Sequence, residues 1–152
     1  MKPWFWILCG AMLLGLGAQE IKLEERRPAA LLYIKGQEEI IVETDLGDKG
    51  SGRDLEEALK DLQERTAGNV LLDTLQDLVV DKHSLQIMDQ AEKLLHPGIR
   101  VCASQGRLAP EKARAYLKIH GKGQSLLKWR QGETGLPILI MEETGFRWMK
   151  QH

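Results

Sequence analysis

Hydrophobic and polar positions alternate along this chain with two periods, one typical of strands and one of helices. Two β-rich runs, residues 29–34 and 39–44, are joined by a short polar segment around Gly36, and this spacing predicts an antiparallel hairpin. The glycine-rich stretch 47–52 that follows predicts a loop. Within it, Ser51 followed by Asp54 resembles the capping box that starts a helix.

Three stretches repeat apolar residues at the spacing of a helix. The first follows the glycine-rich loop and ends near Gly68, because Leu55, Ala58, Leu59 and Leu62 fall on one face. The second runs over 84–97, with Ser84 as its expected cap and the Pro-Gly pair at its end as its stop. The third runs over 110–121, with proline at a favourable first position and glycine as its terminator.

Shorter apolar runs lie between these helices and after them. Residues 69–73 and 77–80 predict two short strands or one interrupted strand, and residues 99–103 predict another. Runs 136–141 and 146–149 predict a closing hairpin. This order is typical of helices packed on a mixed sheet. We therefore expect residues 19–152 to form a single α/β domain, a mixed β-sheet with about three helices packed on it.

Residues 1–18 have the layout of a secretory signal peptide. Lys2 precedes an apolar run from Trp4 to Leu16, and small residues follow it. The uncharged stretch is shorter than the roughly 20 residues that cross a bilayer as a helix, which favours a cleaved signal over an uncleaved N-terminal anchor. Cys9 lacks the small preceding residue of a lipidation site. We expect an extracytoplasmic protein, secreted or membrane-associated through this segment.

Removal of the signal would leave Cys102 as the single cysteine, so we expect no internal disulfide despite export. Cys102 lies in the alternating apolar stretch 99–103. This pattern favours a buried strand thiol over a reactive one.

The composition, 43% hydrophobic and 28% charged, is that of a folded globular chain, and the formal net charge of −1 argues against a polycationic binder. The distribution of charge is more informative than its total. Residues 19–98 hold 10 basic and 18 acidic side chains, whereas residues 99–130 hold eight basic side chains and Glu111 as the one acid. This polarity predicts one basic interaction face with an exposed tryptophan, consisting of Lys112, Arg114, Lys118, Lys122, Lys128, Trp129 and Arg130.

An exported basic face suits an envelope or membrane protein partner, anionic lipid head groups or an anionic wall polymer. Nucleic acid is disfavoured by export and by the small number of aromatic residues in this region. The competing interpretation is a solvated helix surface that pairs with the acidic half of the chain.

Motifs that would assign catalytic roles do not occur in the sequence. The four histidines form neither an H-E-x-x-H pattern nor a Cys/His pair at zinc spacing, and the glycine-rich stretches lack the phosphate-binding and dinucleotide-binding patterns. We predict no catalytic residue, no cofactor and no metal site. The second hypothesis is a small exported enzyme or ligand-binding domain, for which Cys102 and His120 are the best chemical candidates.

The segment 135–145, with Pro137 before an apolar run, resembles the proline-bearing strand and hairpin of thioredoxin-like folds, where that proline is often cis. Because the chain has no C-x-x-C motif, this resemblance implies a redox-silent relative.

A second resemblance covers residues 29–142. After the signal-like start and the hairpin, the run 52–62 (GRDLEEALKDL) and the apolar runs 69–72 and 78–80 are similar to the N-terminal domain of the spore germinant-receptor C-subunit family. The Leu136-Pro137 segment is similar in placement. The resemblance implies a non-catalytic, extracytoplasmic, membrane-proximal assembly subunit of a spore-forming bacterium. The chain departs from the family pattern at Asp73-Thr74 and in having no lipidation motif.

Overall fold

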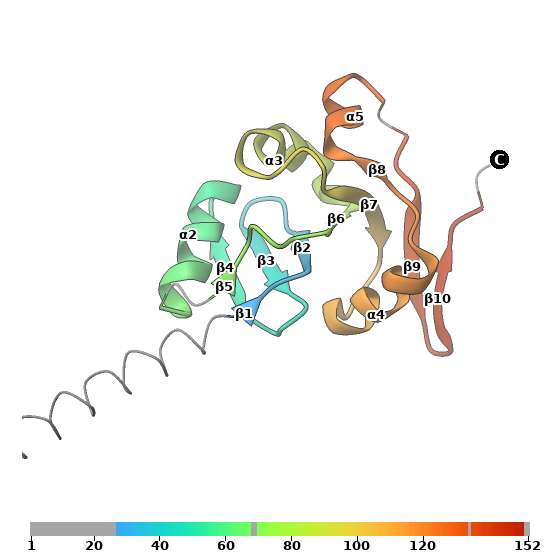
Figure 1. Cartoon of the computed structure of the whole chain (residues 1–152), viewed down its shortest axis with the longest axis horizontal. Helices are drawn as coiled ribbons and strands as arrows, with labels where there is room; N and C mark the ends of the chain where they lie inside the picture. Colours follow the sequence, from blue (N-terminus) through green and yellow to red (C-terminus); the bar gives the residue numbers. More distant parts are fainter. Residues whose placement is uncertain (1–26, 68–69, 134, 151–152) are drawn as a thin grey trace, which may run out of the picture.

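Strands β2 (Leu31–Lys35) and β3 (Ile40–Thr44) form the predicted antiparallel hairpin. They belong to a computed structural model that describes residues 27–67, 70–133 and 135–150 (Figure 1). The predicted signal peptide lies outside these residues. The described residues build a mixed sheet with helices on both faces, which confirms the predicted α/β fold class.

The sheet contains four parallel strands at its centre and antiparallel strands at its edges. Its order is β10-β9-β7-β6-β2-β3-β4. The parallel strands are β2, β6 (Asp77–Asp81), β7 (Arg100–Gln105) and β9 (Ile138–Glu142), and the edges are β4 (Lys49–Gly52) and β10 (Gly145–Trp148). A short strand, β8 (Gln124–Ser125), pairs with β7. A separate parallel pair joins β1 (Arg27–Pro28) to β5 (Val70–Leu71).

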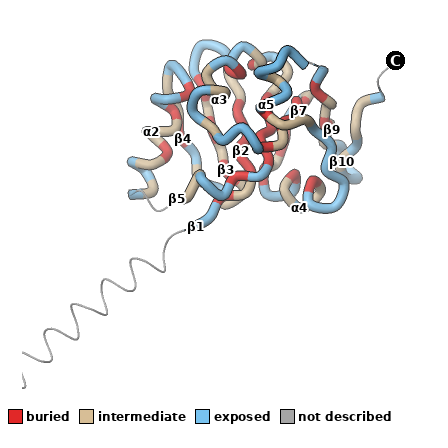
Figure 2. Tube along the Cα trace, turned by 45° about the horizontal axis from the view of Figure 1, so that its top comes forward, coloured by how far each residue is buried: buried red, intermediate tan, exposed pale blue. Residues whose placement is uncertain are grey.

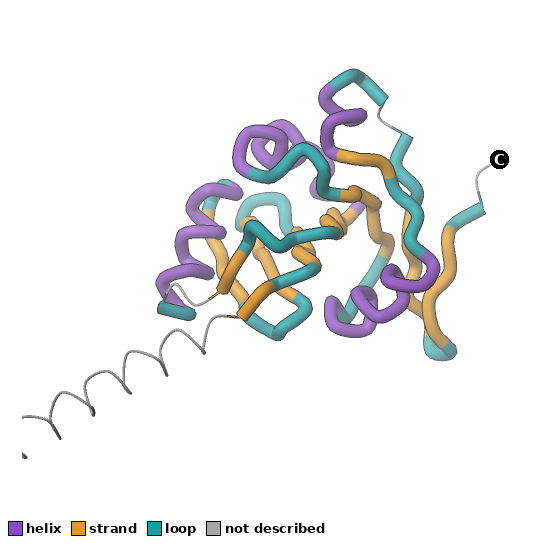
Figure 3. The backbone as a smooth tube through the Cα atoms, in the orientation of Figure 1, coloured by secondary structure: helices purple, strands orange, loops and turns teal. Residues whose placement is uncertain are grey.

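The helices divide between the two faces of the sheet (Figures 1 and 3). One face is covered by α2 (Leu55–Arg65), the 3-10 helix η1 (Lys82–Ile87), α3 (Met88–Leu94) and α5 (Leu126–Arg130). The other face is covered by α4 (Pro110–His120). Figure 1 shows α4 on the opposite side of the strands from α3 and α5.

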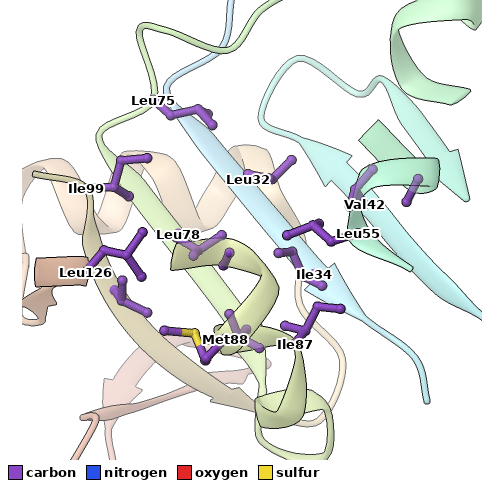
Figure 4. Close-up of a cluster of buried hydrophobic side chains, with 14 of the residues drawn as sticks. Leu32, Ile34, Val42, Leu55, Leu75, Leu78, Ile87, Met88, Ile99 and Leu126 are labelled. Atoms are coloured by element: carbon purple, nitrogen blue, oxygen red, sulfur yellow. The ribbon is translucent and has the colours of Figure 1, made fainter. Parts of the chain in front are cut away.

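Two buried clusters correspond to these two faces. Because side chains alternate along a strand, Leu32 and Ile34 of β2 point into the first cluster, and Leu31 and Tyr33 point into the second. Leu55, Ile87 and Met88 close the first cluster from the helices (Figure 4). Ala113 and Leu117 of α4 close the second. The central strands β2, β6 and β7 are consequently buried along most of their length, in red in Figure 2, which explains their nearly continuous apolar runs.

The stretch predicted as a loop over 47–52 is corrected by the structure, because residues 49–52 form the edge strand β4. Its glycines allow α2 to lie directly on the strand. A Cβ atom added to Gly50 would lie 2.4 Å from the Ala58 carbonyl oxygen, and one on Gly52 would lie 2.6 Å from the Ala58 nitrogen. The cap of α2 is Asp54 rather than Ser51, since the Asp54 carboxylate accepts from the Glu57 N–H at 2.8 Å.

The second helix also begins differently from the prediction. Asp81 caps η1 by accepting from the His83 N–H, and α3 follows from Met88. Ser84, the predicted cap, lies inside η1, where its hydroxyl donates to the Gly36 carbonyl oxygen at 2.6 Å. The runs over 69–73 and 77–80 are two separate strands, β5 and β6, in different sheets. The sequence pattern did not predict α5.

The helix from Pro110 to His120, the strand around Cys102 and the closing hairpin of β9 and β10 lie where the sequence predicts them. The described residues contain no cis peptide bond, so the bond before Pro137 is trans.

Candidate functional site

The structure separates the predicted basic face into two groups. Lys112, Arg114 and Lys118 belong to α4, and Lys122 follows directly after it. Lys128, Trp129 and Arg130 belong to α5. Since α4 and α5 pack on opposite faces of the sheet, these residues do not form one continuous surface (Figure 1).

Arg114 takes part in an ion-pair network that fastens α4 to the sheet. The Asp77 side chain, only 2% exposed, is paired with Arg114 at 3.2 Å and with Arg100 at 2.7 Å. Arg114 also donates to the side-chain oxygen of Gln76, and Arg100 donates to the Leu117 carbonyl oxygen in α4. A buried carboxylate needs such compensation. Arg114 therefore holds α4 in place rather than extending into solvent.

The α5 group is similarly engaged with the fold. Trp129 is half-buried against the first core cluster, so the prediction that it is exposed is wrong. Arg130 donates to the Glu92 carbonyl oxygen in α3 at 2.7 Å. The Ser125 hydroxyl caps α5 by accepting from the Lys128 N–H. Lys128 itself is exposed.

An aromatic cluster joins α4 to the edge strand β10. The ring of Tyr116 stacks on Phe146 at 5.3 Å between centroids and also lies close to His120 and Trp148. Trp148 donates its indole N–H to the His120 carbonyl oxygen at the end of α4. Tyr116, Phe146 and Trp148 are all half-buried, so each exposes part of its ring to solvent.

Ile119 extends from α4 beside this cluster and is 76% exposed. Three lysines lie on α4 or directly after it: Lys112, Lys118 and Lys122 are exposed, and among the described residues none of them forms an ion pair. We name this region the α4–β10 surface, consisting of Lys112, Tyr116, Lys118, Ile119, His120, Lys122, Phe146 and Trp148. Three of the seven predicted residues belong to it.

The apolar half of this surface was not predicted as functional. The sequence predicted Phe146 and Trp148 only as residues of the closing hairpin, and Tyr116 only as part of the helix over 110–121. Ile119 carried a signal, since it lies off the stripe of Ala113 and Leu117 that packs on the sheet. The contact between α4 and β10 left no signal in the sequence, because residues about 30 positions apart come together only through the fold.

A groove of about 610 Å³ is a second candidate site. It lies where β2 and β6 end and where the loop after β7 leads into α4, a location at which open α/β sheets bind ligands. Its lining mixes both signs of charge, with Lys35 and Arg107 opposed by Glu43 and Asp81. None of the seven predicted residues lines it.

The Tyr33 phenol forms part of the floor of this groove. Burial raises its pKa, the neighbouring Ser104 side chain acts in the opposite direction, and the carboxylates of Asp81 and Glu43 raise it further. The Lys35 ammonium lies 5.8 Å from the centre of the Tyr33 ring. The sequence indicated no function for Tyr33, which lies in a predicted strand, or for Ser104, which directly follows the strand predicted over 99–103.

The two chemical groups considered for an enzyme lie apart from this groove. Cys102 is buried in the second core cluster, as predicted, and desolvation raises its pKa to about 12. Such a thiol is protonated near neutral pH and is a poor nucleophile. His120 is exposed on the α4–β10 surface. Within the described ranges, no group of three or more His, Cys, Asp or Glu side chains is arranged to hold a metal ion.

None of the helices that the structure describes is long and apolar enough to cross a bilayer. Comparison of the chain with family models, with curated proteins and with solved structures gave no match.

Proposed function

We propose that this protein is an exported, non-catalytic interaction subunit that works at the outer face of the cell membrane and docks through the α4–β10 surface. The observation that carries the proposal is the combination of Ile119, 76% exposed, with a half-buried aromatic cluster and three lysines without ion pairs among the described residues. Exposed apolar side chains with charged surroundings are typical of docking sites.

The N-terminal pattern supports the export part of the proposal. Lys2 and the apolar run after it are the features by which the secretion machinery recognises a signal. Export would place the α4–β10 surface next to the membrane and wall, where an envelope or membrane protein is available as a partner.

The similarity to the germinant-receptor C-subunit family supports an assembly role, with a link to spore germination. The longest of the runs that carry this similarity, 52–62, covers the β4 end and most of α2, on the opposite face of the sheet from α4. The proposed docking surface is therefore separate from the segment on which the resemblance is best defined.

The test is crosslinking of the tagged full-length chain in cells, with identification of partners by mass spectrometry in membrane and wall fractions. We expect K118E/K122E to lose the crosslinked partner. The matched control is K93E/K128E, which reverses two exposed lysines in the last turns of α3 and α5, on the other face. Equal capture by both variants would refute the proposal.

A small ligand-binding domain is the second candidate, favoured by the 610 Å³ groove at the ends of the parallel strands. Its mixed charge fits a small polar molecule with groups of both signs. Under this alternative, a thermal-shift screen would find a ligand whose stabilisation is lost in R107A and retained in K118E/K122E. The docking hypothesis predicts no dependence of partner capture on Arg107.

A further inference from the structure

We infer that the α4–β10 surface binds the anionic head groups of a lipid bilayer directly. This inference rests on the proposed function, because it names the partner of the same surface. Three observations carry it: the charge of the surface, the kind of apolar side chains it exposes, and their arrangement.

The charge of the surface is mainly positive, because its three lysines form no ion pair among the described residues and Glu111 is the one acid of α4. Lys112 and Lys118 lie on α4 with Ile119, Lys122 follows directly after that helix, and Lys150 follows β10. No Asp or Glu occurs in residues 112–132 or 146–150. Arg114 of α4 is paired with Asp77, a carboxylate that it shares with Arg100. Anionic lipid attracts such lysines, and each one near the surface strengthens binding by about fivefold.

The apolar side chains are those that enter a membrane interface. Ile119 is 76% exposed and would bury its side chain among acyl chains. Tyr116 and Trp148 are half-buried aromatic residues, and Tyr and Trp are enriched at the level of the head groups. The indole N–H of Trp148 is bonded to the His120 carbonyl oxygen, so this ring is held on the end of α4.

The arrangement also favours a lipid surface over a folded partner. The lysine side chains are flexible and exposed, and among the described residues their ammonium groups make no ion pair or hydrogen bond with a fixed partner. Mobile head groups can satisfy such cations without a complementary rigid surface. A protein partner at this surface is an outcome of the test.

A polarity-sensitive fluorophore at position 119 tests contact with lipid in the full-length chain. The probe protein carries C9S and I119C, and buried Cys102 stays unlabelled because its thiol is inaccessible. We expect a shift of emission to shorter wavelength with vesicles of phosphatidylglycerol and phosphatidylcholine, and none with phosphatidylcholine alone. The shift should be lost in 0.5 M salt, because exposed charges are then screened.

Variants separate this surface from the rest of the chain. K118E/K122E should raise the lipid concentration for half of the shift at least tenfold, while K93E/K128E should leave it unchanged. A fluorophore at position 128 on α5 should not respond, because that position lies on the opposite face. Comparing the fluorophores at positions 119 and 128 reports local contact with lipid, whether or not the N-terminal segment attaches the chain to vesicles.

The results distinguish this inference from the proposed function. A probe at position 119 that ignores phosphatidylglycerol overturns the lipid inference. If crosslinking to an envelope protein still depends on Lys118 and Lys122, the docking function stands with a protein partner. If both measurements are insensitive to these lysines, the two proposals fail together.

Discussion

The ion-pair network around Asp77 gives a prediction whose size follows from the structure. Asp77→Asn removes a carboxylate whose side chain is 2% exposed and leaves the guanidinium groups of Arg100 and Arg114 without their counter-ion. Breaking a fully buried pair costs about 3–5 kcal/mol. Arg100 and Arg114 are 36% and 21% exposed, so solvent compensates part of this loss. We expect a loss of about 2–3 kcal/mol.

Urea unfolding followed by far-UV circular dichroism measures this loss. The midpoint should fall while the slope of free energy against urea stays constant. The control is Glu142→Gln, because the Glu142–Arg147 pair is exposed on both sides and should contribute about 0.5 kcal/mol or less. Combining Asp77→Asn with Arg114→Met should cost less than the sum of the single changes, since both act on one interaction. A loss below about 1 kcal/mol for Asp77→Asn would refute the structural role of the network.

Three further predictions concern packing and ionisation. Gly50→Ala should destabilise the fold by at least about 2 kcal/mol in thermal unfolding, because its Cβ would lie 2.4 Å from the Ala58 oxygen. The control is Gly135→Ala, whose Cβ would meet no atom within 4 Å and which should be nearly neutral. The pKa of Cys102 is raised to about 12, so its thiol should resist iodoacetamide at pH 8 in the folded state and react in urea. Peptide mass spectrometry measures the labelling, and labelling of the folded chain would contradict the burial of Cys102. Burial raises the pKa of Tyr33 above its ordinary value of 10.0. The protonated phenol therefore stabilises the fold fully below pH 10, and this stabilisation is lost as pH rises through the folded pKa. Tyr33→Phe should reduce the loss of unfolding free energy at alkaline pH, as measured by unfolding titrations.

Much of the fold could be predicted because local patterns and tertiary packing agree. Apolar residues recur with the strand period in the hairpin of β2 and β3 and in the closing hairpin, and with the helical period in α4. Each of these elements buries the apolar face that its period creates. Pro110 and the glycine after His120 mark the ends of α4 without reference to other parts of the chain.

The errors occur where a residue's role depends on a distant part of the chain. Gly50 and Gly52 suggest a loop in isolation, but they serve as strand residues because α2 must approach β4 closely. Arg114 looks like a free cation in the sequence, and its partner Asp77 lies 37 positions earlier. The five-residue α5 is too short to produce a clear helical period.

The division of the basic segment shows why a run of charge does not define a surface. Between α4 and α5 the chain passes β8, which pairs with the start of β7, and so moves from one face of the sheet to the other. Before this crossing, Tyr116 of α4 stacks on Phe146 of β10, and after it Arg130 of α5 donates to the Glu92 carbonyl oxygen of α3. A surface that combines Lys118 with Trp148 exists only when the closing hairpin is packed on α4. Docking at the α4–β10 surface is therefore tied to the folded state, which a flexible basic segment with the same charges would not require.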